Sequence, residues 1–234
     1  MMKDIFENYV DHSFGSRQQA EFKFKQFEFN YKKYFPKDKL STKLLDIGVG
    51  RGEMLSCMKN WGYENYGGVD ISPSTVTFCQ SLELPCELVS NSTEYLQSKP
   101  ETFDLITLID VLEHIPKGEM ITFLRALKDA LKPGGLTVIQ VPNLQAPDGH
   151  LHRYNDITHE VGFIEHSLAQ VLLASGFKKF EFLGFEEFVF GTPLEHIRKI
   201  FRKMHWLSTR FLRGVDGNIN PKILHPVFAT VALK

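Results

Sequence analysis

The sequence predicts an α/β fold with a doubly wound, seven-stranded and mostly parallel sheet. Short apolar segments typical of strands alternate with segments typical of helices along most of the 234 residues. The segment 103–109 is apolar at almost every position, as in a strand that helices cover on both faces. A glycine-rich turn follows the first of these strands, and ligands of such sheets bind where strands end. We therefore expect a ligand site at the carboxyl edge of the sheet.

Each strand is assigned from an apolar, β-rich segment, and each helix from its capping and stop signals. Ser72 suits an N-cap because its hydroxyl can accept a helix N–H, and Pro73 suits the first helical position. The predicted strands span residues 43–47, 65–69, 86–89, 103–109, 136–141, 177–182 and 227–233. The predicted helices among them span residues 53–60, 73–82, 117–130 and 167–175.

Two helical segments are expected outside this repeating pattern. Residues 1–40 are predicted to form an N-terminal helical cap, or lid, ahead of a main domain at 41–234. Aromatic and charged residues alternate locally in the second half of the cap, as in a strand. The spacing of its aromatic residues, Phe27 and Tyr31 among them, favours a helix instead. The segment 186–226 is predicted to be a helical insertion before the last strand.

Composition argues against several function classes. Lys and Arg number 27 against 28 Asp and Glu, so the net charge of −1 provides no global attraction to nucleic acid. The three cysteines lack the paired spacing of a metal site, and we expect them to be reduced. No apolar segment resembles a signal-peptide core or a membrane span, which predicts a cytoplasmic protein.

The glycine-rich turn joins the first strand to the first helix. Glycine lets the backbone approach a ligand closely and adopt positive φ, and the helix start that follows favours an anionic group. The dinucleotide pattern G-x-G-x-x-G is not matched, because the third glycine, Gly52, comes one residue early and Glu53 occupies its place. This spacing disfavours an NAD-binding oxidoreductase, which is kept as an alternative.

Asp70 follows the second strand, eighteen positions after Gly52. A carboxylate there can accept both hydroxyls of a ribose, in NAD enzymes and in adenosine-binding enzymes alike. The alternative is a surface aspartate in the turn before Ser72. The glycine turn and Asp70 together predict a site for a nucleotide-type cofactor.

Four segments in order resemble the motifs of the class I S-adenosylmethionine-dependent methyltransferases, which have a Rossmann-like fold. They are LLDIGVGRG at 44–52, GVDIS at 68–72, DLI through DVLEHI at 104–115 and LKPGG at 131–135. The resemblance extends from about residue 40 to residue 234. More narrowly, residues 152–160 resemble a subgroup associated with bacterial surface-polysaccharide genes.

By this resemblance the cofactor is S-adenosylmethionine, and its contacts fall on matched positions. Asp46, Gly48 and Gly50 are implied at the methionine end. Asp70 is implied at the ribose, and Ile71 is implied to pack on the adenine.

Asn91 and Asp110 complete the implied cofactor set. Asn91 lies just past the third strand, where the family has an Asp or Asn near the adenine amino group; an ordinary turn asparagine is the alternative. Asp110 closes the fourth strand and is implied beneath the sulfonium, with helix capping as the alternative.

His114 is the first candidate for a catalytic base. It follows the fourth strand at the carboxyl edge of the sheet, and histidine can take a hydroxyl proton near neutral pH. The Glu113–His114 pair occurs widely in the superfamily with varied chemistry. A structural or substrate-orienting role for His114 is therefore the alternative.

The segment after the fifth strand is dense in ionisable residues: His150, His152, Asp156, His159, Glu160, Glu165 and His166. We expect it to face the acceptor, with Arg153 and Tyr154 as acceptor contacts and His159 as the second candidate base. Hydrogen-bonded loop residues are the alternative. Histidine and carboxylates are also metal ligands, but no compact i, i+4 pair on a helix supports a metal, and none is predicted.

The insertion contains an amphipathic helix at 194–213 with six Lys and Arg residues and one acid, Glu195. Such a helix can lie on anionic lipid headgroups, which would place the protein peripherally at the inner face of a membrane. The alternatives are packing on its own domain or across a homodimer.

These observations predict methyl transfer to an oxygen, on a sugar hydroxyl or phosphate of a cell-surface glycan or its precursor. The main alternative is a small-molecule methyltransferase of quinone or secondary-metabolite type. A cofactor-binding partner protein without catalysis is a further alternative. Nucleic-acid methylation is disfavoured, because the end of the fourth strand lacks an Asp/Asn-Pro-Pro-Tyr motif and the charge is balanced.

Overall fold

The computed structural model describes residue 7 and residues 17–234. Within this part of the chain, seven strands form one sheet in the order β3-β2-β1-β4-β5-β7-β6. All paired strands are parallel except β7, which runs antiparallel to β5 and β6. The strands are β1 (Lys43–Ile47), β2 (Asn65–Asp70), β3 (Cys86–Leu88), β4 (Phe103–Ile109), β5 (Leu131–Pro142), β6 (Lys179–Gly184) and β7 (Val227–Leu233). The predicted doubly wound, mostly parallel sheet is confirmed.

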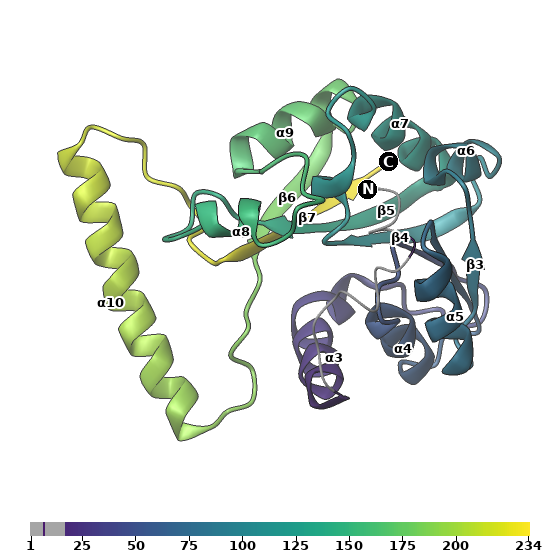
Figure 1. Cartoon of the computed structure of the whole chain (residues 1–234), viewed down its shortest axis with the longest axis horizontal. Helices are drawn as coiled ribbons and strands as arrows, with labels where there is room; N and C mark the ends of the chain where they lie inside the picture. The colour runs from purple at the N-terminus through teal and green to yellow at the C-terminus, as the bar shows by residue number, and fades with distance from the viewer. Residues whose placement is uncertain (1–6, 8–16) are drawn as a thin grey trace.

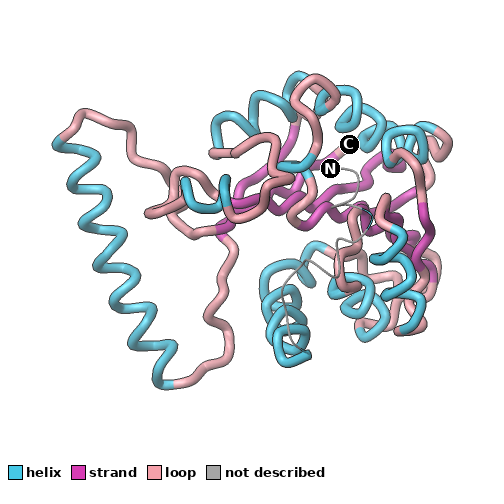
Figure 2. Tube along the Cα trace, in the orientation of Figure 1, coloured by secondary structure: helices cyan, strands magenta, loops and turns pink. Residues whose placement is uncertain are grey.

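Helices cover both faces of the sheet (Figures 1 and 2). Helices α3, α4 and α5 pack on one face around one apolar cluster, and α6, α7 and α9 pack on the other around a second. The described helices are α3 (Arg17–Tyr31), η1 (Lys32–Tyr34), α4 (Glu53–Asn60), α5 (Pro73–Ser81), α6 (Ser92–Gln97), η2 (Leu112–His114), α7 (Met120–Ala130), α8 (His150–Tyr154), α9 (Glu165–Ala174) and α10 (Pro193–Val215).

Several elements differ from the prediction; among them, α9 begins at Glu165 instead of residue 167, and β6 begins at Lys179 instead of residue 177. The short helices α6 and α8 were not expected, because neither is long enough to show an apolar period. Helix α7 begins at Met120 instead of residue 117, because the preceding residues form a turn in which two N–H groups donate to the Pro116 carbonyl. Strand β5 begins five residues early, since it pairs with β4 through a register shift that accommodates Gly134 at φ +78°.

Helix α3 confirms the helical prediction for residues 20–34. Its Phe27 and Tyr31 are buried in the apolar cluster shared with α4, which explains their helical spacing. Most of the first half of the predicted cap, residues 1–6 and 8–16, lies outside the described residues. The predicted domain division at residue 40 stays a prediction.

Helix α10 confirms the predicted helical insertion and lies beside the α/β body between two extended segments (Figure 1). Its polar face is turned to the body: Arg202 donates two hydrogen bonds to Glu186, of 3.0 and 2.6 Å, and Trp206 packs on the His225 ring. Its opposite face carries exposed apolar side chains, at Leu194, Ile197, Ile200, Phe201, Met204, Leu207, Phe211, Leu212 and Val215. None of the described helices combines the length and the low charge that a membrane crossing requires.

Candidate functional site

A cavity of about 580 Å³ lies at the carboxyl ends of β1, β2 and β4. Lys23 and Phe27 of α3 line one side of it, and Thr158 and Glu160 line another. Its lining includes every residue predicted to contact the cofactor, together with one candidate base: Asp46, Gly48, Gly50, Asp70, Ile71, Asn91, Asp110 and His114. The roles of these residues stay predictions, but the fold brings all of them to one place.

The glycine turn exposes bare backbone to the cavity. Gly48 has φ +70°, and a Cβ built there would lie 2.5 Å from a methyl group of Val111. Gly50 and Gly52 also have positive φ, and Gly52 precedes the first residue of α4. Side chains at Gly48 would meet both backbone strain and a collision, so the turn requires glycine there.

Asp46 is buried at the end of β1, where the Thr107 hydroxyl on the neighbouring strand donates to it at 2.6 Å. Burial raises the pKa of this carboxyl well above its usual range; the Thr107 hydrogen bond lowers it in part, and the nearby Glu53 carboxylate raises it further. A positively charged ligand in the cavity would favour the ionised form of Asp46.

Asp70 ends β2, and its carboxylate accepts the Ser72 N–H at 2.8 Å. Burial raises its pKa, while backbone N–H groups of Ser72, Gly50 and Val49 act in the opposite direction. The β1–α4 turn thus helps to hold this carboxylate. Ile71 follows it with a half-exposed apolar side chain at the cavity wall.

Asn91 caps helix α6. Its side-chain oxygen accepts the N–H groups of Thr93 and Glu94, at 2.8 and 3.2 Å. A structural role is therefore shown for this residue, in addition to its place in the cavity lining.

Asp110 forms a hydrogen-bonded chain with two residues that sequence analysis missed. Gln140 donates its amide N–H to both carboxylate oxygens, at 2.9 and 3.0 Å, and accepts the Tyr31 hydroxyl. Burial, followed by the charge of Asp110, raises the pKa of Tyr31, so its hydroxyl stays a donor. The capping alternative for Asp110 does not hold, since η2 has no side-chain cap. Gln140 is a polar residue within the apolar run 138–141, and that was the available signal.

His114 is oriented by a second hydrogen-bonded chain. The Thr158 hydroxyl lies 2.6 Å from Asp156 and 2.8 Å from Nδ1 of His114. Since the carboxylate can only accept, Thr158 donates to Asp156 and accepts the Nδ1–H of His114. This assigns the lone pair of the ring to Nε2. Burial, followed by the nearby His159, lowers the pKa of His114 and keeps the ring neutral.

His159 packs edge-on against His114, with ring centroids 4.8 Å apart. The N–H groups of Glu160 and Val161 donate to the Glu113 carbonyl and hold this segment against η2. His159 lies behind the cavity wall and donates its Nδ1–H to the His152 carbonyl at 2.7 Å. The fold therefore unites both candidate bases, with His114 at the cavity.

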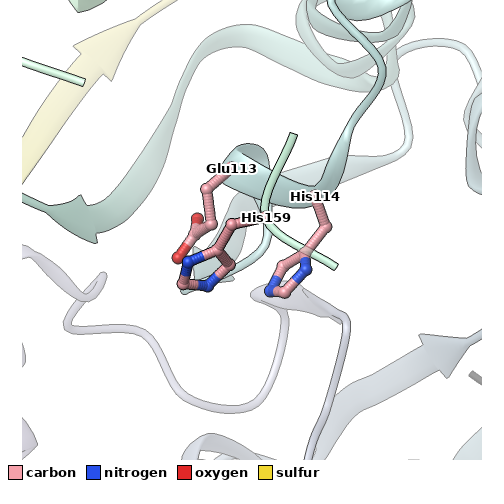
Figure 3. Close-up of side chains that lie close together, drawn as sticks. All are labelled: Glu113, His114 and His159. Carbon is pink, nitrogen blue, oxygen red and sulfur yellow. The ribbon is translucent and has the colours of Figure 1, made fainter. Parts of the chain in front are cut away.

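Glu113 joins this pair from the same turn (Figure 3). Its side chain is buried, and among the described residues neither carboxylate oxygen has a hydrogen-bond partner. Burial raises its pKa well above the usual range, and the Asp110 charge raises it further. One carboxylate oxygen of Glu113 and one ring nitrogen from each histidine lie within 4.8 Å of one another.

The two predicted acceptor contacts lie on α8, away from the cavity lining. Tyr154 is 79 % exposed. Arg153 lies over the Tyr154 ring and donates to the Glu160 carbonyl at 3.4 Å. Acceptor contact by these residues stays a prediction.

A family model described as a methyltransferase domain matches residues 19–181. The chain belongs to this methyltransferase family. An archaeal S-adenosylmethionine-dependent methyltransferase from Archaeoglobus fulgidus superposes with a TM-score of 0.69 at 23 % identity, covering 99 % of each chain. Phosphoethanolamine N-methyltransferase 2 of Haemonchus contortus, solved with S-adenosyl-L-methionine, has a TM-score of 0.62 at 17 % identity, covering 98 % of this chain and 60 % of that one. These two structures share the fold of this methyltransferase.

Among curated relatives, the ubiquinone biosynthesis O-methyltransferase of Aliivibrio fischeri is 31 % identical over 97 residues. The match covers 40 % of this methyltransferase and 41 % of the relative, so it spans about two fifths of each. Family membership confirms the methyltransferase family predicted from the sequence and argues against the NAD-binding alternative.

The volume and the charges of the cavity suit S-adenosylmethionine. Its volume lies within the ~300–1,000 Å³ typical of cofactor sites. Carboxylates of Asp46, Asp70 and Asp110 suit the cationic sulfonium and ammonium groups, and the bare turn at Gly48 leaves room for close approach. When bound, the cofactor supplies an activated methyl group.

Proposed function

We propose that this methyltransferase moves the methyl group of S-adenosylmethionine to a hydroxyl oxygen of a small-molecule acceptor. One observation carries the proposal: His114, with its orienting partners, lines the same cavity as the complete predicted cofactor set. An acceptor bound at His114 would share that cavity with the methyl donor. Proximity of this kind supplies much of the catalysis of a displacement reaction.

The small-molecule acceptor is favoured by the curated relatives, which are named for ubiquinone biosynthesis. It takes precedence over the surface-glycan acceptor expected from the sequence, for which these relatives offer no support. The polysaccharide-associated subgroup and its glycan acceptor stay predictions.

Different residues would bind the cofactor and activate the acceptor. The glycine turn and Asp70 hold and orient the cofactor, and Asp46 and Asp110 place negative charge near its cationic groups. The cluster of Glu113, His114 and His159 is the part of the site suited to activating the acceptor hydroxyl. No covalent intermediate on the protein is needed, because the methyl group is already activated.

The test is an assay of S-adenosylhomocysteine release with purified full-length protein against three acceptor sets. They are monocyclic catechols and hydroquinones, sugar hydroxyls of envelope-glycan precursors, and primary amines. We expect turnover with the phenolic set and loss of turnover in His114→Ala with cofactor affinity retained. Selective turnover of amines would contradict the oxygen acceptor, and selective turnover of glycan precursors would restore the first expectation.

We further propose that α10 rests on an anionic lipid surface through its apolar face. The support is the row of exposed apolar side chains, flanked by exposed Arg198 and Lys203 while Arg202 faces the body. Flotation with vesicles of neutral and of anionic lipid tests this, and we expect binding to anionic vesicles only. Phe201→Asp with Phe211→Asp should abolish it. Absence of flotation, with a dimer in solution that the same changes dissociate, would assign this face to a second copy instead.

A further inference from the structure

Glu113, His114 and His159 direct three electron-pair donors at one small volume (Figure 3). The two histidines use Nδ1–H to donate elsewhere, to the Thr158 hydroxyl and to the His152 carbonyl. In the neutral rings, Nε2 is therefore an acceptor in both. The Glu113 carboxylate is also an acceptor when ionised.

Three acceptors close together are disfavoured unless a proton or a metal cation lies among them. Glu113 is only 2 % exposed, and no other described residue donates a hydrogen bond to its carboxylate. An ionised carboxylate buried in this way is strongly destabilising; the raised pKa of Glu113 avoids that cost in the free protein by protonation, and a bound cation would displace the proton and offset the cost in its place.

We propose that Glu113, His114 and His159 bind a divalent transition-metal ion at the edge of the cavity. Two imidazoles and one carboxylate form a donor set typical of zinc and of iron, with coordination positions left for other ligands. This donor set was missed in the sequence because its members come from η2 and from a segment about 45 residues later, with no helical spacing between them.

The surroundings support metal ligation. Metal-bound histidines generally donate their other ring N–H to a carbonyl or carboxylate, which orients the ring. His159 does so to the His152 carbonyl, and His114 does so to Thr158, which passes the bond on to Asp156.

The donor atoms, within 4.8 Å of one another, need a modest contraction to share one ion. Metal–ligand bonds of about 2.0–2.2 Å place ligand atoms at most about 4.4 Å apart. Binding should therefore draw the 156–161 segment against η2.

The catalytic use of this ion rests on the proposed function. An ion at His114 would bind the acceptor hydroxyl and lower its pKa. The hydroxyl proton passes to water, the oxygen forms a bond to the methyl carbon, and the carbon–sulfur bond breaks. The products are the methyl ether and S-adenosylhomocysteine.

The experiment measures binding without substrate or cofactor. Full-length, tag-free protein, freed of metal with a chelator and then desalted, is titrated with Zn²⁺ in competition with a chromophoric chelator, and with Co²⁺ for its visible absorption. We expect one ion per chain. Glu113→Gln and His159→Ala should each weaken Zn²⁺ binding by at least ~100-fold, more than the ~10–100-fold typical of supporting groups.

Two further variants make the result decisive. Thr158→Val keeps all three ligands and should weaken binding by about 10–100-fold, which covers the case in which Glu113→Gln does not fold. His166→Ala removes an exposed histidine on α9 and should leave Zn²⁺ affinity unchanged. Equal affinity in wild type, Glu113→Gln and Thr158→Val would overturn the site. Metal binding without methyl transfer to any acceptor would uphold the site and refute the proposed function.

Discussion

The cofactor end of the cavity buries charged groups, whereas helix α10 exposes large apolar side chains. At the cofactor end, carboxylates of Asp46 and Asp70 are buried beside tightly packed backbone. On α10, large apolar side chains such as Phe201 and Phe211 are 65 % and 70 % exposed, while Arg202 is turned inward.

Each of these two arrangements costs folding free energy. Burying carboxylates costs free energy that only local hydrogen bonds or a cationic ligand can offset, so the cofactor end is built to be completed by binding. Exposing an apolar helix face costs free energy that a covering surface would offset, as we propose for α10. The proposed occupants differ accordingly: a cationic cofactor at the cavity and an extended surface at α10.

The largest expected contrast comes from glycines with the same backbone angle. Gly48→Ala and Gly217→Ala both place a side chain at φ +70°, but a Cβ at Gly48 meets Val111 and a Cβ at Gly217 meets nothing within 4 Å. We expect urea denaturation to show a loss of about 2–5 kcal/mol for Gly48→Ala, from strain plus overpacking. Gly217→Ala should lose about 1–2 kcal/mol, from strain alone. Equal losses would show that packing does not set the requirement at Gly48.

The next effect concerns cofactor affinity. Asp70→Asn removes the charge at the end of β2, and we expect calorimetry to show S-adenosylmethionine binding weakened by about 10–100-fold, the value of a charge-assisted hydrogen bond. Asp216→Asn, at the exposed end of α10, is the matched control and should bind normally. Normal binding by Asp70→Asn would remove this residue from the cofactor site.

Acid should loosen α10 before it affects the sheet. Burial, followed by the nearby Arg202 charge, lowers the pKa of His225 to about 4, below its ordinary value of 6.5. The released state therefore binds a proton more readily, and docking weakens as the pH falls from about 6.5 towards 4. Hydrogen-exchange protection factors, corrected for the intrinsic effect of pH on exchange, should fall in α10 between pH 7 and 5 and stay unchanged in β1. His225→Asn should remove most of this pH dependence; an unchanged response would refute the assignment.

The smallest effect is proton release at the cofactor end. Burial raises the pKa of Asp46 in the free protein, and a bound cation should lower it. S-adenosylmethionine binding at mildly acidic pH should then release a fraction of a proton, measured by calorimetry in buffers of different ionisation enthalpy. Asp46→Asn should reduce that release. Proton uptake on binding would contradict the sign of this linkage.

Much of the α/β core followed from local pattern. The bounds of β1, α4, β4 and β7 agree with the prediction at both ends, because apolar runs and capping residues specify them within a few positions. The residues that the family resemblance implied for the cofactor line one cavity, since they lie at or after strand ends that a parallel sheet brings to one edge.

Long-range side-chain pairing was not predictable in the same way. Tyr31 reaches Gln140 across 109 positions, and His114 reaches Thr158 across 44. The sequence shows neither pair, because no local spacing relates residues that meet only when separate elements pack.

The orientation of α10 also could not be predicted from the sequence. Its amphipathic period was plain in the sequence, but the side that meets the body was not. The side that meets the body is decided by two contacts with the segments flanking the helix. Arg202 donates a hydrogen bond to Glu186, and the Trp206 ring packs on the His225 ring. Local chemistry thus specified the elements and the cofactor edge, while the hydrogen-bonded chains, the donor cluster at Glu113 and the outward apolar face arose from packing between distant segments.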